Sequence, residues 1–166
     1  NMYREMLGLG QPTGIELDEN IGVLDSPSYR ASIGQTWQTG FSLQSAIGQA
    51  GNLFTPLQLC NYVSTIANGG TRYATHIVKA VYSSDNSTII EEKQPEVLCE
   101  TGFKKKNIQI IKEGMRRVAT VTLAGSFDDS VVEVACKTGT STLEKTINGK
   151  TGIYTNGFLI TMAPYD

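Results

Sequence analysis

Apolar residues recur at helical spacing in two stretches of the chain. The first begins at Thr55-Pro56, a pair suited to the N-cap and the first turn of a helix, and ends at Asn68-Gly69-Gly70. The second runs from Lys104 to Val121, and its opening lysines are interpreted as a solvated helix start. The predicted apolar faces are Leu57, Leu59, Cys60, Val63, Ile66 and Ala67 in the first helix, and Ile108, Ile111, Met115 and Val118 in the second.

Runs of β-branched residues separated by turn formers predict antiparallel strands. Residues 76–82 and 88–92 predict one hairpin, joined across the turn-forming residues 83–87. A strand at residues 131–135 is expected to lead into a Lys-Thr-Gly sequence, and another is predicted at residues 158–162. Between these two, Asn148-Gly149 is the strongest hairpin signal in the chain. Helices combined with antiparallel strand pairs predict the α+β class.

The composition narrows the class of protein. The chain has 166 residues, of which 40% are hydrophobic and 18% are charged. A charged fraction below the roughly 25% of an ordinary soluble domain, together with the 40% of hydrophobic residues, excludes disorder and supports a packed core. The formal net charge is −2, whereas nucleic-acid-binding modules normally have a basic excess, so no nucleic-acid partner is expected. No apolar run reaches the roughly 18 residues of a membrane span.

The cysteines and the single histidine do not suggest a metal site. Cys60, Cys99 and Cys136 are odd in number and widely spaced, so we expect small buried hydrophobes and neither a disulfide framework nor a zinc site. His76 lies in a β-branched stretch without a flanking motif, and we expect a packed or surface strand residue. No metal or organic cofactor is implied.

The sequence Lys-Thr-Gly occurs twice, at residues 137–139 and 150–152. On an edge strand beside an acyl-transfer nucleophile, Lys137 would attract an anionic substrate and the hydroxyl of Thr138 would bind a substrate carboxylate. Gly139 would leave room for the substrate, and the backbone N–H of Thr140 would serve as an oxyanion donor. Taken alone, such a triplet is more often an ordinary exposed strand end.

The first triplet is part of a series of short segments that follow one another along the chain. They are Gly8-Leu9-Gly10-Gln11-Pro12-Thr13-Gly14-Ile15-Glu16-Leu17, Ala46-Ile47-Gly48-Gln49, Thr55-Pro56-Leu57-Gln58-Leu59, Ile66-Ala67-Asn68-Gly69-Gly70, Gly114-Met115-Arg116-Arg117-Val118, Ala135-Cys136-Lys137-Thr138-Gly139-Thr140-Ser141, Asn156-Gly157-Phe158 and Ala163-Pro164-Tyr165-Asp166. Together they resemble the penicillin-binding protein transpeptidases, most closely the class B, monofunctional type. The chain departs from that pattern at Cys136, where glycine is usual, and at residues 159–162.

The resemblance implies a fold and a set of site residues. The fold is that of penicillin-binding proteins and serine β-lactamases, with an antiparallel sheet flanked by helices. Lys137, Thr138 and Gly139 are the implied catalytic-site residues, and Thr138, Thr140 and Ser141 the implied substrate contacts. Lys150, in the second triplet, is expected to be a solvated hairpin residue.

Two motifs of the family are not found in their expected places. The family acylates the serine of a Ser-x-x-Lys motif, but no serine here is followed three positions later by lysine. Ser84-Asp85-Asn86 spells the family's Ser-x-Asn triplet but lies after the Gly8-Leu9-Gly10 segment instead of before it, so we interpret it as turn residues. We therefore expect residues 1–166 to form a partial transpeptidase domain, beginning downstream of Ser-x-Asn and ending before the last strand and helix, and to be inactive alone.

The resemblance also implies an activity for the intact protein. It would cross-link peptidoglycan stem peptides by serine acyl transfer, and β-lactam antibiotics would acylate the same serine. A segment absent from this chain would anchor it at the extracytoplasmic face of the bacterial membrane, where other cell-wall synthesis proteins are possible partners. Two alternatives stay open: a β-lactamase or β-lactam sensor of the same fold, and a non-catalytic binding or scaffold module with a degenerate site.

Overall fold

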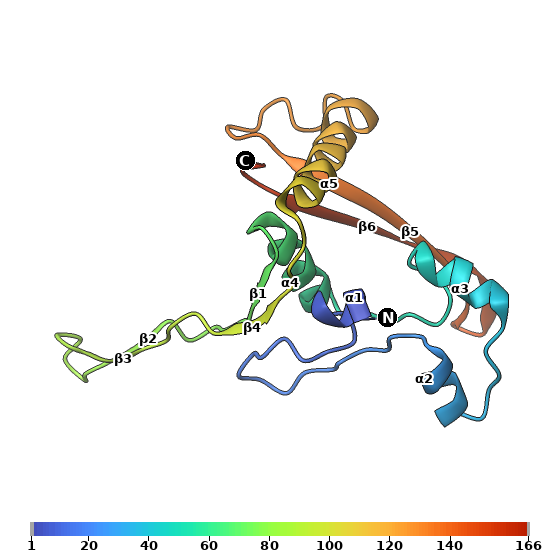
Figure 1. The fold of residues 1–166 in the computed structure, drawn as a ribbon, viewed down its shortest axis with the longest axis horizontal. Coiled ribbons are helices and arrows are strands. Elements are labelled where there is room, and N and C mark those ends of the chain that lie inside the picture. The colour runs from blue at the N-terminus through green and yellow to red at the C-terminus, as the bar shows by residue number, and fades with distance from the viewer. Residues whose placement is uncertain (1, 166) are drawn as a thin grey trace. The chain divides into compact units, whose positions relative to one another are not determined.

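Helices and short antiparallel strand pairs build the chain, as expected for the α+β class (Figure 1). The computed structural model describes residues 2–165, without the side chains of residues 3 and 143. The chain forms two compact units, Asn1–Phe103 and Lys104–Asp166. The first contains the helices α1 (Met2–Met6), α2 (Pro27–Ser32), α3 (Thr39–Ala46) and α4 (Pro56–Ala67), and the strands β1 (Thr71–Tyr73), β2 (Ala80–Tyr82), β3 (Ile89–Glu92) and β4 (Val97–Glu100).

Helix α4 confirms the first helix prediction, including both of its ends. Thr55 accepts a hydrogen bond from the Gln58 N–H, and the Gln58 side chain accepts one from the Thr55 N–H, which is a complete capping box. After Ala67 the chain turns through Gly69 and Gly70, whose φ angles of 92° and 108° suit only glycine.

The buried face of α4 differs from the predicted apolar face. Val63 and Ile66 are buried as expected, but Cys60 is exposed. Buried polar residues take the remaining places: Gln58 donates to the carbonyls of Gln11 and Ile21, and Asn61 donates to that of Tyr73. The helix therefore holds two irregular segments and the end of β1 in place through hydrogen bonds, a role for which an apolar pattern gives no signal.

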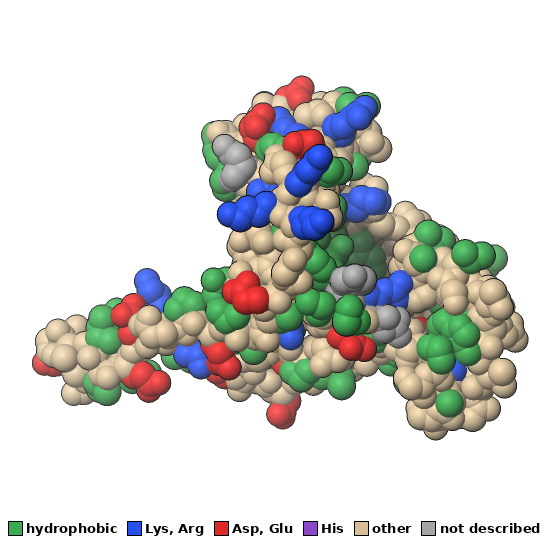
Figure 2. Space-filling view, in the orientation of Figure 1, with side chains coloured by type: hydrophobic (Ala, Val, Ile, Leu, Met, Phe, Trp, Pro, Cys, Tyr) green, Lys and Arg blue, Asp and Glu red, His purple; other side chains and the backbone are tan. Residues whose placement is uncertain are grey.

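The strands of the first unit form two short pairs. β2 pairs with β3 as predicted, but β2 starts at Ala80, so residues 76–79 lie outside it and His76 is exposed and not in a strand. β1 pairs with β4, a pair that no sequence pattern indicated because β1 has only three residues. The β2–β3 hairpin extends away from β1 and β4 as an arm, and Figure 2 shows apolar side chains exposed along it.

The second unit consists of a helix beside a long two-stranded ribbon. Helix α5 (Lys105–Arg117) continues as a π-helical turn (Val118–Thr122), close to the predicted bounds. Ile108, Met115 and Ala119 are buried, whereas Ile111 is 46% exposed and not part of the packed face. The lysines at its start are exposed, as expected for a solvated helix start (Figure 2).

The ribbon pairs β5 (Ala135–Ile147) with β6 (Lys150–Met162) along their whole lengths. Asn148 and Gly149 have φ angles of 52° and 76°, so the predicted two-residue hairpin is confirmed. The strand predicted at residues 131–135 is wrong in its start, because only Ala135 belongs to β5 and Val131 is 99% exposed. The strand predicted at residues 158–162 is the end of the longer β6.

Candidate functional site

The buried end of the ribbon lies next to the first Lys-Thr-Gly triplet. Ala135 and Cys136 are fully buried where β5 packs against α5. Arg116 of α5 donates to the Val134 carbonyl at 2.9 Å and forms an ion pair with Glu133 at 2.7 Å. The residues immediately before the triplet are thus fixed by the helix, and the triplet begins where the strand emerges.

The register of the ladder determines which backbone groups of β5 face away from β6. The Asn148-Gly149 loop closes on a hydrogen-bonded pair, Ile147 with Lys150, and in an antiparallel ladder such pairs alternate with non-hydrogen-bonded pairs. Counting back in steps of two, Gly139 is hydrogen-bonded to β6, whereas Thr138 and Thr140 are not. The N–H and C=O groups of both threonines therefore point to the other edge of β5, which has no strand beside it among the described residues.

Side-chain contacts agree with this alternation. The Lys137 ammonium donates to the Thr138 carbonyl, which is therefore turned away from β6. The hydroxyls of Thr146 and Thr151 are 2.8 Å apart, as expected for a non-hydrogen-bonded pair, where facing side chains are closer.

The five predicted site residues follow one another on β5. Lys137, Gly139, Thr140 and Ser141 are exposed and Thr138 is half-buried. A Cβ on Gly139 would lie 3.6 Å from the Phe158 Cβ, an ordinary contact, and no positive φ requires glycine there. Neither the backbone nor the local packing demands this glycine, which is consistent with space being kept for a ligand. The roles of these residues remain predictions.

Other residues singled out from the sequence lie elsewhere. Ser84-Asp85-Asn86 forms the β2–β3 turn in the first unit, as interpreted. Asp85 accepts hydrogen bonds from Ser83 and Ser87, which lower the pKa of its carboxyl to about 2. Lys150 is exposed beside the hairpin turn, as expected.

The cysteines match their prediction only in part. Cys136 is buried, Cys99 is half-buried and Cys60 is exposed, and all three are free. Burial raises the pKa of the Cys136 thiol, against a smaller opposite effect of the Lys137 charge. Cys60 lies off the packed face of α4, which Gln58, Asn61 and Thr65 share with Val63 and Ile66.

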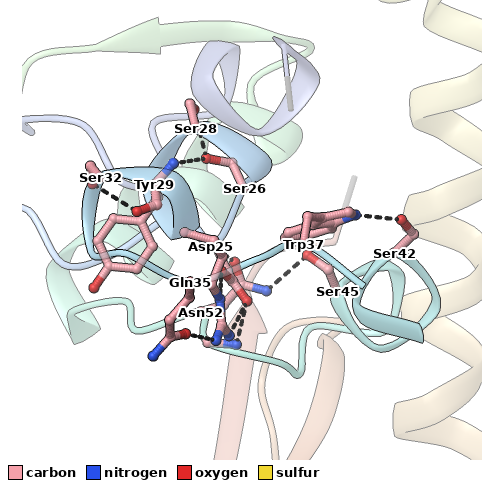
Figure 3. A network of polar contacts seen from close by, with 12 residues as sticks. Asp25, Ser26, Ser28, Tyr29, Ser32, Gln35, Trp37, Ser42, Ser45 and Asn52 are labelled. Carbon is pink, nitrogen blue, oxygen red and sulfur yellow. Dashed lines mark hydrogen bonds and ion pairs between the residues drawn. The ribbon is translucent and has the colours of Figure 1, made fainter. Parts of the chain in front are cut away.

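A polar network in the first unit was not predicted from the sequence (Figure 3). Asp25, which is fully buried, accepts hydrogen bonds from two Arg30 nitrogens at 2.6 and 2.7 Å and from the Gly51 N–H at 2.8 Å. The Arg30 hydrogen bonds are the main cause of the lowered pKa of Asp25. The Asn52 side-chain oxygen accepts from the Asp25 N–H. A carboxylate that pairs with an arginine five residues away has no fixed sequence motif. The one local signal beside this network is Ser26-Pro27, where Ser26 caps α2 and Pro27 is its first residue.

Two general features complete the description. Within residues 2–165, no three His, Cys, Asp or Glu side chains gather closely enough to hold a metal ion. Every helix in this part of the chain is too short or too polar to traverse a bilayer.

Comparisons with known proteins agree with this architecture. The family model of the penicillin binding protein transpeptidase domain matches residues 1–166. Penicillin-binding protein 2A of Bacillus subtilis is 38% identical over 172 residues, which cover 99% of this chain and 23% of the relative. Peptidoglycan D,D-transpeptidase MrdA of Haemophilus influenzae is 27% identical, over 96% of this chain and 26% of the relative. The structure of penicillin-binding protein 2B from Streptococcus pneumoniae strain R6 has a TM-score of 0.76 at 28% identity, over 98% of this chain and 26% of that one.

The chain therefore belongs to the penicillin-binding protein transpeptidase domain family. Its relatives include class B penicillin-binding proteins, and its fold is that of their transpeptidase domains. It spans about a quarter of the length of the relatives that it matches.

Proposed function

We propose that the protein containing this chain is a peptidoglycan D,D-transpeptidase that works by serine acyl transfer. The observation that carries the proposal is the Lys137-Thr138-Gly139 triplet at an open strand edge, with the backbone groups of Thr138 and Thr140 directed outward. Membership of the transpeptidase family supports it. Stem peptides and β-lactams are the proposed ligands, and other cell-wall synthesis proteins are proposed partners at the extracytoplasmic face of the membrane.

The proposed chemistry has two steps. A serine hydroxyl attacks the carbonyl between two D-alanines, its proton passes to the departing amine, and D-alanine leaves while an ester forms with the serine. The amine of a neighbouring peptide then attacks that ester, forms the cross-link and returns the proton to the serine. In each step negative charge develops on the carbonyl oxygen, and the outward N–H of Thr140 is placed to donate to it.

In this proposal the chain supplies the β5 side of the catalytic site, with the Lys137–Gly139 triplet and Thr140. It contains no Ser-x-x-Lys sequence, so we propose that residues 1–166 are part of a transpeptidase domain whose serine and lysine base come from other residues of the protein. The isolated 166-residue chain is then expected to form no covalent adduct with penicillin. A stoichiometric adduct seen by intact-protein mass spectrometry would contradict this.

The test is a pair of proline substitutions in the intact protein. Thr140→Pro removes one outward N–H and leaves the β5–β6 ladder whole, since proline is tolerated where the N–H faces away from the partner strand. Acylation by labelled penicillin should fall about 100- to 1,000-fold, the usual effect of losing an oxyanion donor. Thr142→Pro makes the same change two residues further along and should leave acylation within about threefold.

Two outcomes would overturn the proposal. Unchanged acylation in Thr140→Pro would remove this N–H from the mechanism. Rapid turnover of a chromogenic cephalosporin by the intact protein would instead favour a β-lactamase. Hydrogen exchange checks the geometry independently, because the amide of Thr140 should exchange faster than those of Gly139 and Ser141.

A further inference from the structure

Two lysines lie together at the tip of the β5–β6 ribbon, beyond the proposed catalytic site. Lys145 faces Gly152 across the ladder and Ile147 faces Lys150. Residues two apart on a strand share a face, so both ammonium groups extend from the same side of the ribbon. Both are exposed, and the ion pairs in the described part of the chain involve other residues, so neither lysine has a carboxylate partner there.

The surface between the lysines is open. Gly152 has no side chain, and a Cβ placed on it would lie 3.7 Å from the Tyr154 ring, which therefore borders the glycine. Glu144 is the only acidic residue between positions 141 and 157, and it pairs with Ile153 on the opposite face. The lysine face of the tip thus combines two positive charges, the Tyr154 ring, the partly exposed Ile147 side chain and a glycine that leaves space for a ligand.

The tip is ordered by its own contacts. The Asn148-Gly149 turn has the backbone angles of a two-residue hairpin loop, and the hydroxyls of Thr146 and Thr151 form a hydrogen bond at 2.8 Å. A ligand would therefore meet a preformed turn that carries both lysines and would not have to order a loop on binding.

The tip is also continuous with the proposed site. Lys145 is five residues beyond Thr140 on the same strand, about 17 Å at the usual rise per residue. The open edge of β5 continues along this stretch, with the backbone groups of Thr142 and Glu144 directed outward like those of Thr140. An extended peptide added to that edge as a further strand would reach the level of Lys145 after about five residues and the level of Lys150, which faces Ile147, after about seven.

We propose that Lys145 and Lys150 form a carboxylate-binding subsite for an acidic peptide substrate lying along the open edge of β5. The proposal rests on the proposed function, which supplies the peptide, and it adds the part of the substrate that is recognised away from the reacting bond. Charge complementarity selects the occupant, because the lysine face carries positive charge without a compensating acidic group.

The experiment measures peptide binding to the intact protein by fluorescence anisotropy, which needs no turnover. The probes are a labelled peptide ending in D-alanyl-D-alanine with one free carboxylate further along, and the same peptide with that carboxylate converted to a carboxamide. The test variant is Lys145→Glu with Lys150→Glu. The matched control is Lys79→Glu with Lys93→Glu, which makes the same charge change in the other unit.

The acidic peptide should bind the test variant about five- to tenfold more weakly than the wild type, while the amidated peptide and the control variant change less than twofold. The difference should shrink between 0.05 and 0.5 M salt because exposed charges are screened. Penicillin is too small to reach the tip, so its acylation rate should be unchanged. Three results would overturn the subsite. The test variant could lose affinity equally for both peptides, or the control variant could lose as much affinity as the test variant. The wild type could also bind the acidic and the amidated peptide equally well. A wild-type protein that penicillin does not acylate would instead overturn the proposed function.

Discussion

The two Lys-Thr-Gly triplets have the same residues and opposite surroundings. The first begins one residue after the fully buried Cys136, where β5 leaves its packing against α5. The second begins one residue after Gly149, at the exposed turn of the same ribbon. In both, the middle threonine occupies a non-hydrogen-bonded position, so local backbone geometry does not distinguish them.

Anchorage is the physical difference between the triplets. A group that must meet a developing charge has to be held within a fraction of an ångström, which requires packed neighbours. The first triplet has them in Ala135 and Cys136, while the second has only the ladder, the turn and one hydroxyl pair, with no fully buried residue next to it in the chain. A Lys-Thr-Gly triplet is therefore a candidate catalytic site only when packed residues next to it in the chain hold its strand in place.

The most direct way to break this comparison is to remove the lysine from each triplet in the intact protein. Lys137→Ala should lower the rate of acylation by labelled penicillin about ten- to a hundredfold, the loss expected for a charge-assisted hydrogen bond. Lys150→Ala should change it less than twofold, because the side chain is exposed at the turn. Equal effects of the two substitutions would mean that anchorage does not distinguish the triplets.

Adding a methyl group to the glycine of each triplet sharpens the comparison. In Gly139→Ala the new Cβ makes only an ordinary contact with Phe158, so the melting temperature should stay within about 2 °C of the wild type. Acylation should nevertheless fall about tenfold if the glycine keeps space for the substrate. Gly152→Ala, beside the Tyr154 ring, should alter neither quantity. A Gly139→Ala protein with full acylation would show that this space is not used.

Elements with local signals were predictable from the sequence. Thr55-Pro56 gave the start of α4 and Asn148-Gly149 gave the ribbon turn, because capping and positive φ angles depend on a few adjacent residues. The α+β class and the transpeptidase fold followed from these elements together with the resemblance. The position of the first triplet on a strand was predicted too, although that strand starts four residues later than expected.

Features that depend on partners far along the chain were not predictable. The Gln58 side chain donates to carbonyls 47 and 37 residues away, and Asp25 accepts from the Gly51 N–H 26 residues away. The outward direction of the Thr138 and Thr140 backbone groups follows from the predicted turn only if no bulge interrupts the ladder, because a shift of one residue would reverse it; the structure shows an uninterrupted register. The sequence indicates which residues belong to the candidate site, and the ladder determines how their backbone groups point.

The smallest expected effect concerns the thiol that precedes the first triplet and has no counterpart beside the second. Burial raises the pKa of Cys136, so the folded protein holds that proton more tightly than the unfolded chain does. The resulting stabilisation is complete below the ordinary thiol pKa of about 8.5 and is lost as the pH rises toward the raised value.

The free energy of unfolding of the intact protein should therefore fall more steeply above pH 8.5 than that of Cys136→Ala, in urea titrations at pH 7, 8, 9 and 10. Cys60 and Cys99 are present in both proteins, so their own titration cancels in the difference. Parallel curves for the two proteins would show that the thiol is not shielded from water, and the anchorage assigned to the first triplet would then lack its buried neighbour.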